Sequence, residues 1–370
     1  MPPLDQDRFF SFRAGPRWLK PTDTTATRRI KPDEAGFHHR TAILLLILAC
    51  LFWGISFPVS KSLTLLYLQS MPGSSSWFVV SLQGSIRFLM AGLLMVPFCW
   101  RELSSLRGSE VIQGLGLGFC GGAGMLFQMD GLAYTSASIS AFLTQAYCIL
   151  LPLYHFARTR TVPGLRDLLA IFMVVSGIAI LANVDWRTFR ISRGELETLI
   201  SAVFFTCQIL WLERPAFRPN RTRLVSTTMF LSMGLVFGLA ALCTRPDRMN
   251  YATAIDSFAK LVLTLLLVFF STLLAFNLMN HCQPAITSTE AGIVYTTEPM
   301  FTAVFALFLP TQLSGLAHID YANEQFSLTV LSGGGLILLA NLLLQIRSRK
   351  AIPPVAEVRT PAAGFQKPSS

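Results

Sequence analysis

Charged residues are scarce in this sequence. Asp, Glu, Lys and Arg make up only 14% of its 370 residues, whereas hydrophobic residues make up 52%. Soluble globular proteins average about 25% charged residues. The composition therefore excludes an ordinary soluble domain, because so much apolar surface needs lipid as well as a protein core to cover it.

Motifs of enzymes and metal sites are also lacking. The seven cysteines stand singly with no C-x-x-C pair, and the five histidines form no H-E-x-x-H motif. We therefore expect no disulfide framework, no metal site and no cofactor. No serine lies in a nucleophile elbow, so a membrane-embedded enzyme is the weakest function class left open. The net charge of +10 lacks the basic helix or aromatic-interleaved patch of a nucleic-acid binder.

One glycine-rich stretch, "QGLGLGFCGGAGMLFQMDG" at residues 113–131, contains the letters G-x-G-x-x-G. A dinucleotide site also needs a preceding strand and an acidic residue about 20 positions later. Here a polar turn precedes the glycines, and Asp130 follows much too soon. Glycines at every fourth position of this stretch fit a helix better, because small residues on one face let a neighbouring helix approach closely. The predicted packing stripe consists of Gly114, Gly118 and Gly122.

What the sequence does contain is a series of apolar blocks about 20 residues long, the length that crosses a bilayer as a helix. We count ten, at about 42–60, 77–98, 111–130, 134–157, 167–184, 196–213, 224–244, 259–279, 285–309 and 328–346. The fold class predicted from them is all-α, a polytopic membrane protein with ten transmembrane helices as two inverted five-helix repeats. Two halves with an odd number of spans must enter the membrane from opposite sides.

The basic residues orient these spans. With the N-terminus in the cytoplasm, most of the 30 Lys and Arg residues fall on the cytoplasmic side. We therefore predict both termini in the cytoplasm and a location in the plasma membrane, which is the inner membrane of a bacterium. The predicted parts are a disordered basic arm (1–40), a first repeat (41–184), an outer linker (185–195), a second repeat (196–346) and a disordered tail (347–370).

Several segments carry a family resemblance. "FWGISFPVSKSL", "IRFLMAGLL", "GLAYTSASISAFL" and "NHCQPAITSTEAGIVYTTEPMFTAVFALFL" resemble the EamA-type transporters of the drug/metabolite transporter superfamily. The resemblance implies a basket of helices around a central cavity, and efflux or other movement of small metabolites by alternating access. The sequence departs from the family at the extra loop "LAHIDYANEQ" before the last span.

Two charges, Arg87 and Glu298, lie mid-way along predicted spans. Each costs about 2.5 to 3.5 kcal/mol at mid-bilayer on insertion scales, so each should face a cavity or a partner. Pro299 leaves the carbonyl of Tyr295 without its helical donor, and Pro152 interrupts another span in the same way. We predict that Glu298 beside a free carbonyl holds an ammonium group or a proton, with a buried structural acid as the alternative. A fixed clamp between helices is the alternative for Arg87.

Other polar or aromatic residues within spans are candidates to line the cavity: Trp53, Gln128, Thr144, Gln145, Gln208, Asn277 and Tyr295. For the amides and Thr144 the alternative is an ordinary interhelical hydrogen bond, and for Trp53 it is packing. The predicted function is a secondary transporter of small metabolites, possible substrates being amino acids. A lipid or lipid-linked-sugar flippase of the same architecture is the main alternative. The predicted partners are a small-molecule substrate, the lipid bilayer and protons, and the oligomeric state stays open.

Overall fold

The computed structural model describes residues 32–160, 162, 164–182, 191–247, 256–325 and 327–348. Residues 1–31 of the predicted arm, most of the predicted tail and residues 185–190 of the predicted linker therefore lie outside the described residues, whereas residues 32–40 of the arm lie in a helix. The chain divides into two units, Met1–His38 and His39–Ser370. Of the first unit only the start of one helix is described, and the rest of that helix and all other described elements belong to the second unit.

All regular elements in the described residues are helical. The longer helices are α1 (Pro32–Ser70), α2 (Ser76–Leu103), α3 (Gly108–Tyr134), α5 (Tyr147–Thr159), α6 (Leu165–Leu181), α7 (Arg193–Leu212), α8 (Thr222–Thr244), α12 (Thr297–Ala306) and α14 (Leu328–Ser348). The shorter α-helices are α4 (Ala137–Thr144), α9 (Phe258–Leu266), α10 (Ala275–Cys282), α11 (Ser288–Tyr295) and α13 (Leu309–Ala317). Two 3₁₀ turns, η2 (Pro215–Phe217) and η5 (Gln283–Ala285), and a π-helical segment, η4 (Leu267–Leu274), complete them.

The described part of each predicted apolar block is mainly helical, but the blocks are not all equal. Within the described residues, seven helices are long and apolar enough to cross a membrane, and an eighth is added if a bent pair counts as one span. α6 has 17 residues, and the apolar described part of α14 is Leu328–Leu343. An all-helical polytopic membrane protein is thus confirmed. The count of ten spans is not, and the inverted repeat stays a prediction.

A proline follows two of the helix breaks directly, Pro299 in α12 and Pro310 in α13. α11 ends at Tyr295 and α12 begins at Thr297, which places Pro299 in the first helical turn, where its missing N–H is not needed. α4 and α5 are separated at Gln145, while Pro152 lies within α5. α12 is also bent by 61° against α13. The breaks at Gln145 and at Thr296 lie near the middle of predicted spans, whereas the bend between α12 and α13 lies at the end of one.

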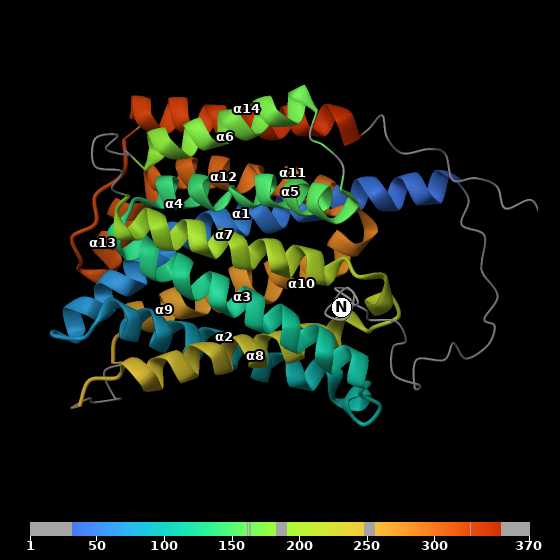
Figure 1. Cartoon of the computed structure of the whole chain (residues 1–370). Coiled ribbons are helices and arrows are strands. Elements are labelled where there is room, and N and C mark those ends of the chain that lie inside the picture. The colour runs from blue at the N-terminus through green and yellow to red at the C-terminus, as the bar shows by residue number, and fades with distance from the viewer. Residues whose placement is uncertain are drawn as a thin grey trace, which may run out of the picture. The chain divides into compact units, whose positions relative to one another are not determined.

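Within this unit, α6 packs against α14 along one side and α2 packs against α8 along the other (Figure 1). α3 lies between α7 and α8. Its predicted stripe of Gly114, Gly118 and Gly122 faces Thr228, Ser232 and Val236 of α8. A second row, Gly116, Gly121 and Gly124, faces Trp211, Gln208 and Phe205 of α7. The glycine-rich helix is therefore in close contact on two sides.

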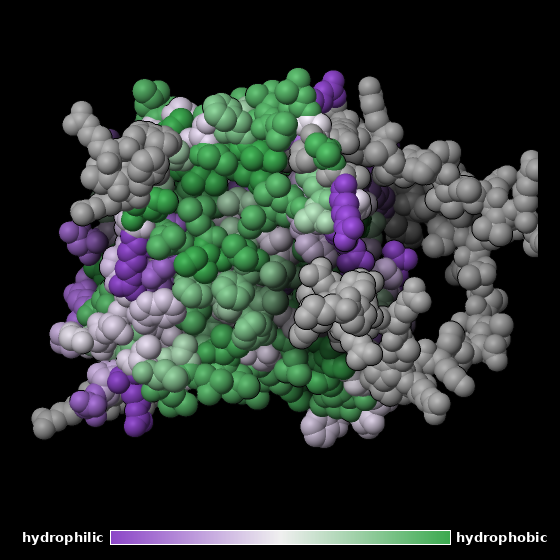
Figure 2. Space-filling view, viewed as in Figure 1, coloured by the Kyte–Doolittle hydropathy of each residue, from purple (hydrophilic) through white to green (hydrophobic). Residues whose placement is uncertain are grey.

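Large hydrophobic side chains cover the outside of the unit. Leu93, Phe98 and Phe172 are each more than three-fifths exposed. Figure 2 shows hydrophobic residues across the middle of the visible face and hydrophilic residues toward its ends. This distribution is that of an integral membrane protein, because only lipid covers such a belt favourably.

Candidate functional site

A cavity of about 60 Å³ lies in the middle of the helical unit. Its aromatic walls are Trp53, Phe57, Tyr147, Phe205, Phe276 and Tyr295. Its polar lining consists of Ser56, Gln128, Thr144, Gln208 and Glu298, and Met125, Ile209 and Met279 complete it. α1, α3, α4, α5, α7, α10, α11 and α12 all contribute, so segments from both halves of the chain meet here.

Glu298 is the one acidic residue of this lining, and no Lys, Arg or His is among the described residues that line the cavity. Its side chain is buried, with the residue 8% exposed. No ion pair joins it to a basic residue in the described ranges. Glu298 lies in the first turn of α12, where the partial positive charge of a helix N-terminus favours a carboxylate. The helix break thus supports a negative charge that faces the cavity.

Aromatic rings surround the space next to this carboxylate. The ring centroids of Trp53 and Tyr295 are 5.7 Å apart, and those of Trp53 and Phe276 are 5.3 Å apart. Tyr147 meets Tyr295 edge-on at 6.5 Å. Electron-rich ring faces attract cations and apolar groups alike. The site therefore combines one acid with walls that suit an organic cation.

Two buried donors of the lining have no hydrogen-bond partner, Tyr147 Oη and Gln208 Nε2. Gln128 Nε2, in contrast, donates to Thr144 Oγ1 at 2.9 Å. Buried donors left unpaired cost free energy unless a ligand or water accepts from them. The cavity thus offers acceptor capacity at Glu298 and donor capacity at two other positions.

Six of the nine cavity residues predicted from the sequence line the cavity: Trp53, Gln128, Thr144, Gln208, Tyr295 and Glu298. The other three, Arg87, Gln145 and Asn277, do not line it. Gln145 is fully buried, and its Nε2 donates to the Tyr295 carbonyl at 3.2 Å. Asn277 Nδ2 donates to the Leu273 carbonyl at 2.6 Å. The expected free carbonyl of Tyr295 is therefore wrong, because Gln145 supplies the donor that Pro299 removes.

Arg87 is buried away from the lining, with an exposure of 1%. Its Nε donates to Thr272 Oγ1 at 2.6 Å and its Nη2 to Ser271 Oγ at 2.9 Å, both on the π-helical η4. Arg87 and Glu298 do not pair. The carbonyl of Ser271 accepts from Trp53 Nε1 at 3.2 Å. Arg87 is thus connected to the cavity wall through η4 and Trp53.

The sequence did not point to Tyr147, Phe205, Phe276 or Met279, which also form the wall. Aromatic and Met residues are common throughout apolar spans, so their presence alone carries no signal. Tyr147 had one, since it lies between Gln145 and Pro152 in the same predicted span. In the structure Tyr147 begins α5, directly after the break at Gln145.

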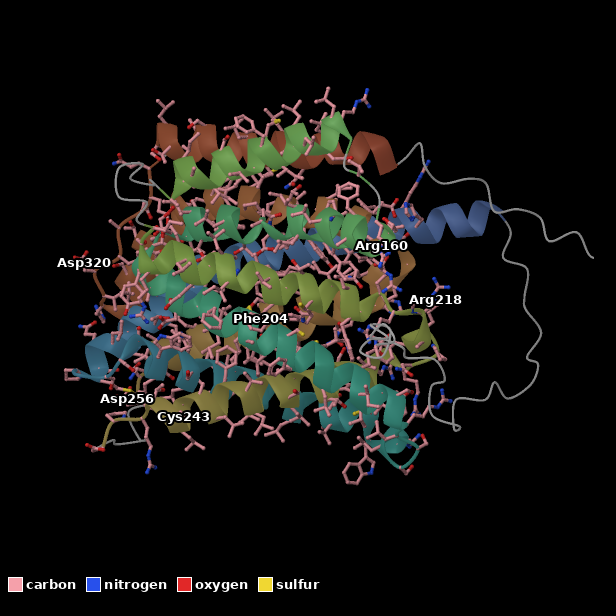
Figure 3. The ribbon with its side chains drawn as sticks, in the orientation of Figure 1. Arg160, Phe204, Arg218, Cys243, Asp256 and Asp320 are labelled. Carbon is pink, nitrogen blue, oxygen red and sulfur yellow. The ribbon has the colours of Figure 1, made fainter. Side chains whose placement is uncertain are left out.

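Hydrogen bonds lie on both sides of the cavity. Figure 3 shows Arg160 and Arg218 toward one end of the unit, and Asp256 and Asp320 toward the other. Toward the Arg218 end, Tyr295 Oη donates to Gln283 Oε1 at 2.7 Å, and Gln283 Nε2 donates to the Ile209 carbonyl at 3.3 Å. Toward the Asp320 end, the hydroxyls of Ser140 and Thr198 are 3.4 Å apart.

The extra loop before α14 also closes the Asp320 end. The Glu324 carboxylate accepts from the backbone N–H groups of Ala137 (2.6 Å) and Ser138 (3.3 Å), the first residues of α4. The backbone N–H of Glu324 donates to the Ala306 carbonyl of α12 at 2.9 Å. The loop therefore ties α4 to α12, and the departure from the family pattern has a structural role.

Removing this contact should loosen α4. We expect Glu324→Ala to lower stability by about 1 kcal/mol, since an acceptor for N-terminal helix N–H groups is lost. Thermal unfolding of the purified protein measures the change. Asp320→Asn, in the same loop and exposed, is the control and should leave the melting temperature unchanged; equal losses in both variants would contradict the capping role.

Comparisons with known proteins agree with this architecture. Residues 40–183 match the model of the EamA-like transporter family. A protein of Archaeoglobus fulgidus described as an uncharacterized transporter is 28% identical over 313 residues, which are 84% of this chain and 88% of that protein. A solved crystal structure is similar with a TM-score of 0.53 at 14% identity, covering 84% of this chain and 99% of that one. The structural match shows the fold alone, and the first two indicate a transporter rather than an enzyme. The predicted resemblance is confirmed.

Proposed function

We propose that this chain, whose residues 40–183 belong to the EamA-like transporter family, is a secondary transporter that moves a small amine-bearing metabolite by alternating access. The observation that carries the proposal is Glu298, a buried carboxylate on the cavity wall with no basic partner in the described ranges. Amino acids and related amines are the substrate class. Export is the proposed direction.

Glu298 supplies a reason for coupling. A buried, unpaired carboxylate is costly, and either a proton or a substrate ammonium group removes that cost. When the cavity is closed on both sides, the site should therefore hold one or the other. Competition of proton and amine for one carboxylate makes the two exchange across the membrane. The sequence contains no nucleotide-binding motif, so an ion gradient or substrate exchange is the proposed source of energy.

The cavity walls favour the rest of such a substrate. Trp53, Tyr295 and Phe276 provide ring faces for the ammonium group or for an apolar side chain. Tyr147 Oη and Gln208 Nε2 are donors without partners, and they suit a carboxylate or carbonyl of the substrate. About 60 Å³ is room for only a few water molecules. Binding therefore requires the cavity to widen, as alternating access implies.

The two sets of hydrogen bonds serve as the proposed gates. The Tyr295–Gln283–Ile209 bonds would open toward the Arg218 end, and the Ser140–Thr198 and Glu324 contacts toward the Asp320 end. We place the Arg218 end on the cytoplasmic side of the plasma membrane, because Lys and Arg residues are enriched on the cytoplasmic side of membrane proteins. Arg193, at the opposite end, is ion-paired with Asp130 and Glu197 and so is neutralised.

Flux of a panel of amino acids and amines into proteoliposomes, with and without a pH gradient, tests the proposal. We expect the gradient to drive uptake by the wild type, and Glu298→Gln to lower that flux about 100-fold, since losing a charged partner in a buried site costs roughly 2 to 3 kcal/mol. Glu298→Asp should keep part of it. Glu102→Gln, half-buried near the Arg218 end, is the control for removing an acid.

Each outcome has a clear meaning, provided that thermal unfolding shows the Glu298→Gln variant to be folded. Flux that is equal in Glu298→Gln and wild type would sink the coupling role and leave a facilitator. If no amine on the panel moves, the same vesicles carrying fluorescent phospholipid test the flippase alternative directly.

A further inference from the structure

A second cavity, of about 160 Å³, lies at the Arg218 end of the unit. It is formed by the turn after α7, the start of α8 and the junction of α10 with η5. Arg214, Arg218, His281, Asn220 and Asn280 are among its lining residues, and Glu213 also lines it. Figure 3 shows Arg218 at this end of the molecule, well away from Phe204 in the middle. The central cavity does not use any of these residues.

The arginines at this end fall into two groups. Arg221 is bound by Glu110, with its Nε 2.7 Å from Oε1, and this hydrogen bond raises the pKa of Arg221. Arg223 lies 3.9 Å from Glu102. Arg214 and Arg218, in contrast, form no ion pair with an acidic residue anywhere in the described ranges. With two arginines and one glutamate, Glu213, in its lining, the second cavity therefore carries a net positive charge, and neither arginine is held by an ion pair.

Neutral contacts hold this basic wall in place. The Arg214 guanidinium stacks on the Trp211 ring at 3.9 Å. Trp211 Nε1 donates to the Gln113 carbonyl at 3.2 Å, and Asn220 Nδ2 donates to Gln113 Oε1 at 2.8 Å. A stacked guanidinium loses little further freedom when it binds a ligand, and its planar fork matches the oxygens of a phosphate. The charge of Arg214 is thus positioned, and Arg218 lies exposed in the same lining.

A buried polar atom in the same lining also lacks a partner. Asn280 is 4% exposed; its Nδ2 donates to Ser226 Oγ at 3.0 Å, whereas its Oδ1 has no hydrogen bond. An acceptor buried in this way needs a donor, which a water molecule bound to a phosphate group can supply, as can the hydroxyl of a free hydrogen phosphate. This requirement is independent of the arginines.

We infer that the second cavity binds a phosphate group, held by the guanidinium groups of Arg214 and Arg218. The chemistry is shared by the headgroup of an anionic phospholipid and by free phosphate. The bound group would contact the segment around Gln283, because Asn280, His281 and Pro284 line the cavity and Gln283 accepts from Tyr295 Oη. It would therefore stabilise the closed gate at this end. Only this effect on the gate rests on the proposed function; the binding does not.

Thermal unfolding of the purified full-length protein in detergent tests the binding. We expect inorganic phosphate to raise the melting temperature in a saturable way at constant ionic strength, compared with chloride. The double variant Arg214→Gln/Arg218→Gln should lose this shift. Arg160→Gln, an exposed arginine at the same end (Figure 3), should keep it in full. An equal loss in Arg160→Gln would mean a general surface-charge effect and overturn the inference.

A second arm separates the two phosphate sources. The same variants are measured in nanodiscs of phosphatidylcholine with and without phosphatidylglycerol. A shift with phosphatidylglycerol but not with inorganic phosphate assigns the site to a lipid headgroup, and the reverse assigns it to a free phosphate. A shift with neither overturns the inference. If the double variant does not fold, the single variants Arg214→Lys and Arg218→Lys take its place. Each keeps the positive charge but loses the planar guanidinium fork, so each should weaken phosphate binding about tenfold. Binding as tight as that of the wild type in both variants would also overturn the inference.

Discussion

Arg87→Met is expected to leave the protein folded with an unchanged or higher melting temperature, while substrate affinity falls about tenfold or more. The buried guanidinium has no acidic partner in the described ranges, and its Nη1 has no hydrogen bond at all. Replacing a buried charge by a side chain of similar volume is often neutral or stabilising. Ser271 and Thr272 would keep partners, because both hydroxyls also donate to the Leu267 carbonyl.

The loss of function has a separate cause. Arg87 fixes the side chains of η4, and the Ser271 carbonyl of η4 accepts from Trp53 Nε1. π-helical segments are rare within α-helices and are frequently found at functional sites. Without Arg87, η4 can shift, and Trp53 can shift with it; small misplacements of binding groups cost at least tenfold in rate or affinity. Arg87 would then be a positioning residue for the cavity.

Substrate KM, melting temperature and Trp53 emission in a variant with Trp53 as its single tryptophan measure these effects separately. Thr272→Val removes one of the two bonds and should give a smaller change of the same kind. Arg101→Met, an exposed arginine in the last turn of α2, is the matched control. A fall in melting temperature with an unchanged KM would contradict the positioning role and leave Arg87 as a purely structural clamp.

These residues show how far the sequence could predict the site. A polar residue within an apolar block is costly in lipid, so Glu298, Gln128 and Gln208 could be placed in the interior. The same signal also selected Arg87 and Gln145, whose side chains donate hydrogen bonds to other helices and do not line the cavity. Whether a buried polar side chain lines the cavity or bonds to another helix depends on partners far along the chain. These partners are Ser271 and Thr272 for Arg87, and Tyr295 for Gln145.

The fold shows the same division. Apolar length predicted where helices run, and Pro299 predicted one break. The π-helical η4 had no signal, because "LVFFSTLL" is an ordinary apolar stretch whose geometry depends on Arg87 and Trp53 from other helices. The loop carrying Glu324 was visible as a departure from the family, but its contact with α4 joins residues 187 positions apart. Contacts of that kind come from packing and not from local sequence.

A graded loss of stability is expected along the glycine stripe of α3. A methyl group at Gly118 would lie 2.4 Å from Ser232 Cβ and 2.7 Å from the Met229 carbonyl oxygen. That oxygen belongs to the backbone of α8 and cannot move alone, so Gly118→Ala should force the helices apart. We expect a loss of about 1 to 3 kcal/mol, the usual cost of overpacking. Close packing matters here because lipid tails are as apolar as the helix surfaces, so the hydrophobic effect does not drive helices together inside a bilayer.

The other two glycines should rank below Gly118. At Gly114 the nearest backbone oxygen would be 3.0 Å away, and at Gly122 the nearest atom of any kind 3.2 Å. Gly335→Ala on α14 is the control, since nothing lies within 4 Å of the added methyl group there; it should be neutral or stabilising by up to about 1 kcal/mol through helix propensity. Melting temperatures in one detergent give the order. Because a helix-propensity gain applies to all four substitutions, only steric contact with α8 can make Gly118→Ala the most destabilising, and any other order would place the tight contact of α3 elsewhere.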